Sequence, residues 1–259
     1  MPTVSSSWFM RFPLMQPRMR LFCFSYAGGS AVGYLDWQKS LVPDIEVCAI
    51  QLPGRGNLFH ETAITDMRIL LDYLVPAMAE QIGRSTLPCA LFGHSLGALL
   101  AFEVARHLPR HLHGRLAHMF VSGCEAPSDR SHSKGLHRLP DIELIEELKR
   151  FEGTPPEILE HQELMKLVLP TIRADFMLAE SYVYVPGPPL STPLTVLAGR
   201  EDKDCEAVRV RSWCRETERE TDFFWLNGGH FFIQSQQAAV LERVRETLIG
   251  CLQAPALDC

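Results

Sequence analysis

The sequence predicts an α/β protein with a mostly parallel central sheet and helices on both faces of that sheet. Short β-rich apolar runs alternate with amphipathic stretches, and most of these runs lack the apolar–polar alternation of a half-exposed strand. The 259 residues, 46% of them apolar, are enough for a large core, and no repeat or low-complexity linker divides them. We therefore expect a single domain over residues 1–259.

The expected elements follow one another in a regular order. Strands are predicted at 20–25, 45–50, 89–93, 118–123, 194–199 and 222–226. Helices are predicted around 34–42, 65–82, 95–108, 206–217 and 235–252. A strand followed by a helix and then by another strand gives parallel pairing through a right-handed crossover.

One segment breaks this order. Residues 126 to about 187 carry several helical patterns with proline and glycine between them, and no convincing strand. They are predicted to form a helical lid inserted after the fourth strand. Within it, Ile172, Phe176 and Ala179 share one face of a helix, which suits either core packing or a substrate slot.

Composition argues against several other classes of function. The net charge of −6 disfavours a nucleic-acid partner, because phosphate backbones attract clustered lysine and arginine. No apolar run approaches the roughly 18 residues of a membrane span, and the start of the chain lacks the continuous apolar segment of a secretory signal. The eight cysteines are scattered singly without a CxxC pair. We expect a cytoplasmic protein with reduced thiols and no metal site.

A serine lies at the sharpest of the expected turns. The sequence GHSLG, residues 93–97, ends one predicted strand and begins the next predicted helix. In this setting G-x-S-x-G places the serine on a strained turn with its hydroxyl exposed above the sheet. Gly93 and Gly97 leave room for backbone that passes close to the turn. Ser95 is therefore predicted to be a catalytic nucleophile.

A serine hydroxyl attacks at neutral pH only when a base removes its proton. Of the ten histidines, His230 in LNGGHFF follows the last predicted strand, where the chain order serine, acid, histidine requires it. Three acids could orient this imidazole. Asp202, on the loop after 194–199, is favoured, with Glu125 and Asp204 as alternatives that loop placement leaves open.

Attack on a carbonyl also creates an oxyanion, which needs preorganised hydrogen-bond donors. One predicted donor is the backbone amide of Leu96, directly after the nucleophile. The second is expected from Ala27, in the loop FSYAGGSA, where glycines allow amides to point inward. The Walker-like glycine spacing of this loop lacks the lysine and the serine or threonine that bind phosphate and magnesium.

Six motifs together resemble a known family. In chain order they are FSYAGGSA, IQLPGRG, FGHSLGALLAFEVAR, PTIRADF, GREDKD and GGHFF, within residues 18–250. The combination resembles the type II thioesterases of nonribosomal peptide and polyketide synthesis, and it is similar to the medium-chain acyl thioesterase of fatty-acid synthesis. The resemblance implies an α/β-hydrolase fold with Ser95, Asp202 and His230 at the triad positions. Tyr26 stands where many members have histidine, and Lys203 where bacterial members often have proline.

The resemblance implies a serine thioesterase that removes acyl groups from the phosphopantetheine arm of acyl or peptidyl carrier protein domains and so clears stalled synthetases. A medium-chain fatty acyl thioesterase, or a free-standing serine esterase or acyltransferase, is the alternative reading. A triad, an oxyanion hole and water suffice for thioester hydrolysis, so no cofactor and no metal are expected. The chain is expected to act as a monomer.

The start of the predicted lid is rich in serine, glycine, proline and charge. Residues 127–140, PSDRSHSKGLHRLP, are predicted to be its mobile part. The basic side chains of Arg130, Lys134 and Arg138 could meet an acidic carrier surface, although a solvated loop is the simpler reading.

Overall fold

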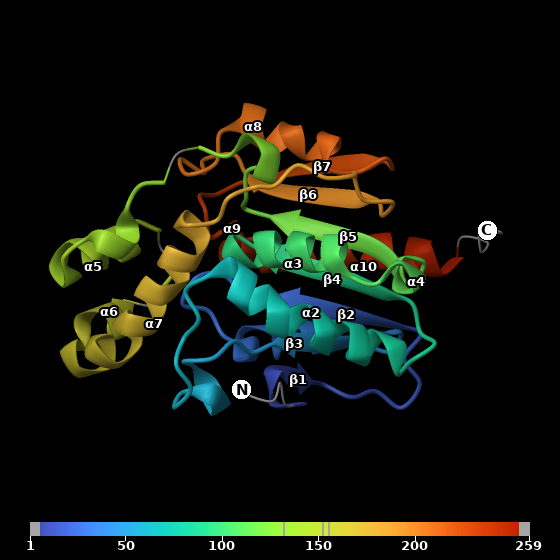
Figure 1. Ribbon diagram of the computed structural model, residues 1–259, viewed down its shortest axis with the longest axis horizontal. Coiled ribbons are helices and arrows are strands. Elements are labelled where there is room, and N and C mark those ends of the chain that lie inside the picture. The colour runs from blue at the N-terminus through green and yellow to red at the C-terminus, as the bar shows by residue number, and fades with distance from the viewer. Residues whose placement is uncertain (1–5, 132, 152, 155, 254–259) are drawn as a thin grey trace.

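A seven-stranded sheet forms the centre of the molecule (Figure 1). The computed structural model describes residues 6–131, 133–151, 153–154 and 156–253, so both ends of the expected 1–259 domain lie outside the described residues. The strand order is β1-β3-β2-β4-β5-β6-β7, with β1 antiparallel to β3 and the other neighbouring pairs parallel. The strands are β1 Phe9–Arg11, β2 Met19–Phe24, β3 Ile45–Ile50, β4 Cys89–His94, β5 Leu116–Ser122, β6 Leu194–Gly199 and β7 Thr221–Leu226.

The six predicted strands are confirmed, and β1 is an addition. β1 pairs with the outer edge of β3, with Phe9 opposite Ile50. Three residues are too few to show a strand period, so the sequence carries no signal for it. Every residue of β2, β3, β4 and β6 is buried. Burial on both faces explains why these runs do not alternate between apolar and polar residues.

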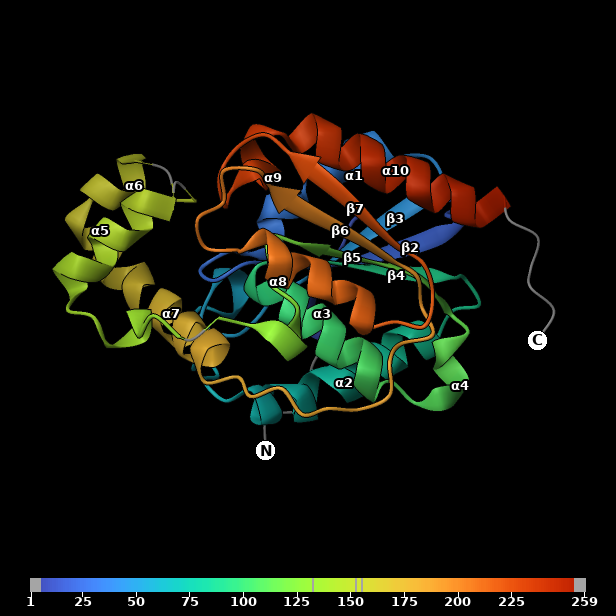
Figure 2. The same ribbon diagram turned by 90° about the horizontal axis from the view of Figure 1, so that it is seen from above.

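Helices cover both faces of the sheet, as Figure 2 shows with α1 and α10 on one side and α2, α3 and α8 on the other. No helix within the described ranges combines the length and apolarity needed to cross a membrane. The helices outside the insertion are α1 Trp37–Leu41, α2 Met67–Gly83, α3 Leu96–His107, α4 Arg110–His113, α8 Ala207–Arg211, α9 Phe232–Ser235 and α10 Gln237–Gln253.

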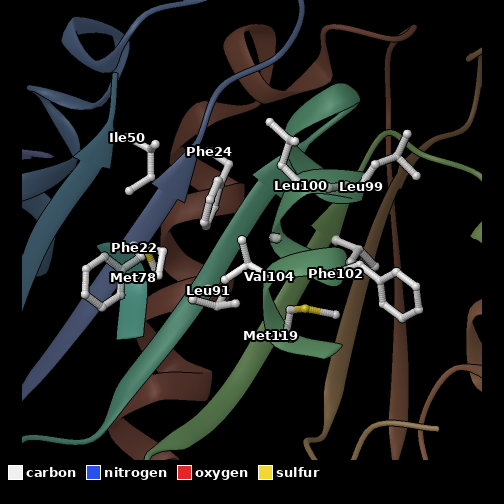
Figure 3. Close-up of a cluster of buried hydrophobic side chains, with 14 of the residues drawn as sticks. Phe22, Phe24, Ile50, Met78, Leu91, Leu99, Leu100, Phe102, Val104 and Met119 are labelled. Carbon is white, nitrogen blue, oxygen red and sulfur yellow. The ribbon is translucent and has the colours of Figure 1, made fainter. Parts of the chain in front are cut away.

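Helix α3 is the best buried helix and packs directly on β4 and β5. Its Leu99 and Val104 belong to one buried cluster with Phe22, Leu91 and Met119 of the strands (Figure 3). The ten consecutive residues from the start of the helix are all buried. This packing fixes the first turn of α3 rigidly at the end of β4, where Ser95 lies.

The predicted helical insertion is here called the lid insertion (residues 126–187), and its helices lie beyond one end of the sheet in Figures 1 and 2. Its described residues form no strand, and its α-helices are α5 Asp141–Phe151, α6 Pro156–Glu160 and α7 Gln162–Glu180. These helices bury their own apolar cluster, which includes Leu144, Leu148 and Met165. Leu178, near the end of α7, joins the main core instead. The far end of α7 therefore attaches the insertion to the sheet domain.

Candidate active site

Ser95 lies at a sharp turn between β4 and α3. Its φ of 55° is in the left-handed region, and it is the one non-glycine residue with a positive φ in the described ranges. A Cβ on Gly93 would lie 2.1 Å from the carbonyl oxygen of Gly97, and a Cβ on Gly97 would lie 2.1 Å from that of Phe24. Glycine is therefore required on both sides of the serine, as predicted. The strained turn presents the Ser95 side chain at the carboxyl edge of the sheet.

Two side chains from neighbouring loops complete a hydrogen-bonded chain with Ser95. Nε2 of His230 lies 3.0 Å from Oγ of Ser95, and Nδ1 of His230 lies 2.8 Å from Oδ2 of Asp202. The Asp202 side chain is fully buried. A neutral imidazole that donates its Nδ1 proton to this carboxylate leaves Nε2 free to accept the serine proton. The structure thus brings together the three side chains that the sequence predicts as a triad.

The parallel pairing of β6 and β7 places Asp202 and His230 beside each other. The strands pair up to their last residues, so the loops that follow begin at the same edge of the sheet. A Cβ on Gly199, the last residue of β6, would lie 2.6 Å from the carbonyl oxygens of both Gly228 and Gly229. Glycine at this position lets the acid loop and the histidine loop approach closely.

The two alternative acids are engaged elsewhere. Asp204 forms ion pairs with two basic side chains of the lid insertion, Lys134 and Arg150. Glu125 is buried and accepts hydrogen bonds from two backbone amides, at 2.7 and 3.0 Å. Neither carboxylate is hydrogen-bonded to His230 in the described structure. Of the three candidate acids, Asp202 is the one that is hydrogen-bonded to His230, and it is also the one that loop placement favours.

A second histidine, which the sequence analysis did not single out, packs behind this chain of side chains. His94 occupies the variable position before the nucleophile in G-x-S-x-G, and its ring lies 5.4 Å from that of His230. Its Nδ1 is 2.9 Å from Oγ of Ser122, while its Nε2 has no partner in the described structure. Burial, and after it the nearby His230, lowers the pKa of His94 well below its usual range. His94 therefore stays neutral at neutral pH and places no positive charge beside His230.

Two backbone amides are available beside the nucleophile. Ala27 and Leu96 line the same cavity as Ser95, and neither amide donates to an acceptor within the described residues. The next amide in the glycine loop, that of Gly28, is already used, because it donates to Oδ2 of Asp175 at 2.7 Å. The amides of Ala27 and Leu96, which are predicted as oxyanion donors, are therefore both free to donate in the described structure.

A cavity of about 870 Å³ lies between these groups and the lid insertion. On the lid side, the rings of Phe151 and Phe176 stack with centroids 6.2 Å apart, and Phe151 lies 5.8 Å from the ring of His230. The predicted face of α7, with Ile172, Phe176 and Ala179, lines the cavity and also packs against the apolar clusters. This face of α7 therefore combines the two predicted uses, which are core packing and lining a substrate slot. Polar side chains from the loop before α5, the glycine loop after β2 and residues 182–184 also line the cavity.

The same region holds the one group of potential metal ligands found in the described ranges. Single ligand atoms of Asp202, Cys205 and His230 lie within 4.8 Å of one another. The hydrogen bond between the carboxylate and the imidazole accounts for their proximity. Burial, and after it the neighbouring Asp202, raises the pKa of the Cys205 thiol well above its usual value, which disfavours the thiolate that a metal would need. The donor set therefore fits a proton-transfer chain better than a metal centre.

Comparison with known proteins gives a consistent family. The family model described as a thioesterase domain matches residues 19–248. Linear gramicidin dehydrogenase LgrE of Brevibacillus parabrevis is 38% identical over 250 residues, which are 95% of this chain and 94% of that protein. Thioesterase PikA5 of Streptomyces venezuelae is 34% identical over a match that covers 97% of this chain and 89% of that protein. Although the name of the first mentions a dehydrogenase, the family that matches nearly the whole chain is that of thioesterases.

Solved structures agree with the observed architecture. The type II thioesterase BorB from the borrelidin biosynthetic cluster superposes with a TM-score of 0.84 at 35% identity, over 94% of this chain and 98% of its own. Its similarity extends over the sheet and the lid insertion, since so little of either chain is left out. The predicted fold is therefore confirmed. This chain belongs to the thioesterase family, and it is an α/β-hydrolase that cleaves thioesters with a serine.

Proposed function

We propose that this enzyme hydrolyses acyl thioesters on the phosphopantetheine arm of carrier protein domains in nonribosomal peptide or polyketide synthesis, as a type II, editing thioesterase. The observation that carries the proposal is the Ser95–His230–Asp202 chain at the wall of a cavity of about 870 Å³. That volume suits an acyl chain together with the end of a flexible arm. The biosynthetic settings in the names of its relatives support the carrier-bound form of the substrate.

The first half of the reaction transfers the acyl group to Ser95. His230 takes the hydroxyl proton as Oγ attacks the thioester carbon, and the carbonyl oxygen becomes an oxyanion that accepts from the amides of Ala27 and Leu96. Asp202 holds the imidazole in the required tautomer and stabilises its charged form. When the C–S bond breaks, the leaving sulfur takes the proton from His230 and departs as the carrier thiol.

The second half returns the serine to its starting state. A water molecule that has replaced the thiol gives its proton to His230 and attacks the acyl carbon. The same two amides hold the second oxyanion, and the C–O bond to Ser95 breaks as His230 returns the proton to Oγ. The products are a free acid and the original enzyme. All the proposed groups come from one chain, so the proposed reaction needs no residue of a partner, and we propose a monomer as the active species.

The direct test uses an acylated carrier protein as substrate. The wild-type enzyme and the Ser95→Ala variant are incubated with it, and mass spectrometry follows both the free acid and the deacylated carrier. We expect stoichiometric acid and free phosphopantetheine thiol with the wild type alone. A carrier that stays acylated while a small acyl thioester is hydrolysed would reject the carrier as partner.

The same assay separates the alternative readings. An acyltransferase would move the acyl group to an added alcohol or amine acceptor instead of water, because both compete for the same acyl-enzyme. A medium-chain fatty acyl thioesterase would discharge medium-length acyl chains much faster than short or branched ones. We expect water as the acceptor, and we expect short misprimed acyl groups to be removed.

A further inference from the structure

Two motifs of the sequence have no part in the proton-transfer chain, yet the structure brings them to its side. Arg55 belongs to IQLPGRG, after β3, and Asp175 belongs to PTIRADF, on α7 of the lid insertion. Both are buried, with 8% and 1% of their surface exposed. They form a bidentate ion pair, with Nη1 of Arg55 2.6 Å from Oδ2 of Asp175 and Nη2 2.7 Å from Oδ1.

This pair holds the glycine loop that carries Ala27. Oδ2 of Asp175 accepts the Gly28 amide at 2.7 Å, and Nη1 of Arg55 donates to the Gly29 carbonyl at 3.1 Å. The two side chains thus fix the backbone on both sides of Gly28, immediately after Ala27. Gly28 itself is exposed, but both charged side chains are buried, and charge-assisted hydrogen bonds to such groups are strong.

Packing adds to these hydrogen bonds. Gly28 has a φ of 77°, and a Cβ there would lie 2.8 Å from Cγ1 of Ile172, one turn before Asp175 on α7. Further along the loop, Oε1 of Gln51 accepts the Ala31 amide at 2.8 Å. The glycine loop is therefore held by α7 of the lid insertion on one side and by the segment after β3 on the other.

We propose that Arg55 and Asp175 are positioning residues for the oxyanion hole. Asp175 accepts a hydrogen bond from the Gly28 amide and so fixes the peptide between Ala27 and Gly28. The Ala27 amide then remains free and faces the nucleophile. Because Asp175 lies on α7, the oxyanion hole is complete only while this helix is seated on the glycine loop. The lid insertion therefore does more than enclose the acyl chain, since its seating sets the geometry of the catalytic amides. The inference rests on the oxyanion role proposed for Ala27.

A purely structural role is the competing explanation. Replacing a buried ion pair by apolar residues of similar size is often neutral for stability, so stability alone does not require the pair. The chain offers a matched control in Arg20 and Glu46. They are also 8% and 1% exposed, with Nε of Arg20 2.7 Å from Oε2 of Glu46, and they join β2 to β3 without contact to the glycine loop. Glu46 also accepts from the half-exposed Arg11 at 2.9 Å, so its removal is at least as disruptive as that of Asp175.

The test compares two double variants with this control. In R55M/D175L the pair is replaced by apolar side chains, and in R55M/D175N the charge pair is lost but an oxygen that can accept the Gly28 amide is kept. R20M/E46L removes the control pair. Each variant is checked by circular dichroism and thermal melting, and each is assayed with the acyl thioester of N-acetylcysteamine, so that carrier recognition plays no part.

The readouts separate transition-state from ground-state effects. They are kcat and KM, the Ki of a trifluoromethyl ketone analogue that forms a tetrahedral adduct with Ser95, and the Kd of the unreactive amide analogue. For R55M/D175L we expect kcat to fall about 100-fold, the scale seen when an oxyanion donor is removed, with a parallel rise in Ki and with KM and Kd unchanged. R55M/D175N is expected to regain part of kcat, and the control is expected to keep all four values.

Three results would overturn the proposal. The first is an unchanged kcat in folded R55M/D175L, and the second is a fall in kcat matched by a weaker Kd for the amide analogue. The third is equal activity of the two Arg55 and Asp175 double variants, since they differ in the acceptor offered to Gly28. None of these results bears on the carrier partner, which is tested separately with the acylated carrier protein.

Discussion

Ser95 combines a strained backbone with a hydroxyl that contributes little to packing. Replacing it by alanine keeps the Cβ and removes only Oγ, so the turn and the core beneath it stay intact. We expect Ser95→Ala to lose all thioester hydrolysis while its melting temperature stays equal to or slightly above that of the wild type, because strained active sites often cost stability. Activity is measured with a small thioester, and a fluorophosphonate probe should label Ser95 in the wild type. Labelling of a different serine would reject the nucleophile.

The acid is tested by the neutral isosteres of the three candidates. Asp202→Asn should reduce kcat on the order of 10⁴-fold, because an amide beside Nδ1 favours the wrong tautomer of His230. Asp204→Asn and Glu125→Gln should keep most of the activity, since neither carboxylate reaches the imidazole. Steady-state kinetics of the three variants on one thioester decide the assignment. A larger loss in Glu125→Gln than in Asp202→Asn would show that the acid is wrong.

The hydrogen-bonded chain of the three proposed catalytic residues could be expected because each lies on a turn or loop after a strand that the sequence makes visible. Ser95 follows β4 directly, Asp202 and His230 lie in the loops after β6 and β7, and parallel strands end at the same edge of a sheet. Arg55 and Asp175 could not be predicted as a pair, because 120 residues separate them and their contact depends on how α7 packs against the glycine loop. Buried pairs of this kind have no period and no fixed spacing in the sequence.

At the scale of elements, the sequence predicts the fully buried strands well, but it predicts the ends of helices and the edge strand of the sheet less well. The predicted helix at 206–217 is α8 followed by a 3-10 turn, Ser212–Arg215, and the predicted helix at 235–252 begins after a separate short helix, α9. These breaks leave the apolar pattern unchanged, so periodicity does not reveal them. The short edge strand β1 was missed for lack of length.

The loop that begins the lid insertion is fixed to its surroundings by two carboxylates. Glu180 at the end of α7 accepts the amides of Leu136 and His137 at 2.9 and 3.1 Å, and Asp204 pairs with Lys134. These contacts anchor several points of a segment whose mobility was predicted from composition. Burial would raise the pKa of both carboxylates, but hydrogen bonds from His137 to Glu180, and from Lys134 and Arg150 to Asp204, outweigh it and lower both pKa values.

These lowered pKa values predict how the lid insertion responds to acid. A carboxylate whose pKa is lower in the folded state stabilises that state above its unfolded pKa of about 4, and the stabilisation is lost as the pH falls through the folded value. We expect Asp204→Asn to lower the melting temperature at pH 7 by about 3 °C, for a loss of about 1 kcal/mol. The difference from the wild type should shrink as the pH falls below about 4. Thermal melts between pH 7 and pH 3 check this, and a constant difference across that range would contradict it.

At the scale of the whole molecule, chemistry and selection come from different parts of the chain. The proposed catalytic side chains follow strands of the sheet, whereas one wall of the cavity and much of its rim belong to the lid insertion. A rigid sheet suits the proton-transfer chain, because its distances must hold within a fraction of an ångström. An insertion of helices can vary the cavity without moving the triad. The contact of Asp175 with Gly28 is one of the points where the two parts meet, together with Leu178 in the main core and the ion pairs of Asp204.

The last prediction concerns how the molecule distinguishes a carrier protein from a free thioester. Of the three basic residues first considered for docking, Arg130 donates to the Ala179 carbonyl and stacks on Tyr182, and Lys134 pairs with Asp204. Their charges are therefore used within the molecule. Arg138 is exposed, and its side chain donates to Nε2 of the neighbouring His137. It is the best placed of the three to meet an acidic partner.

We expect Arg138→Ala to lower kcat/KM for an acyl-carrier protein about threefold, the effect of one exposed charge pair, and to leave the value for an acyl-pantetheine thioester unchanged. The difference should shrink at high salt, because exposed charges are screened. Lys134→Ala serves as the matched control, and it should affect both substrates alike, since its partner Asp204 lies beside the acid loop at the cavity. Both substrates are assayed at low and high ionic strength. If Arg138→Ala slows both substrates equally, the loop acts on the cavity, and carrier docking must lie on another face.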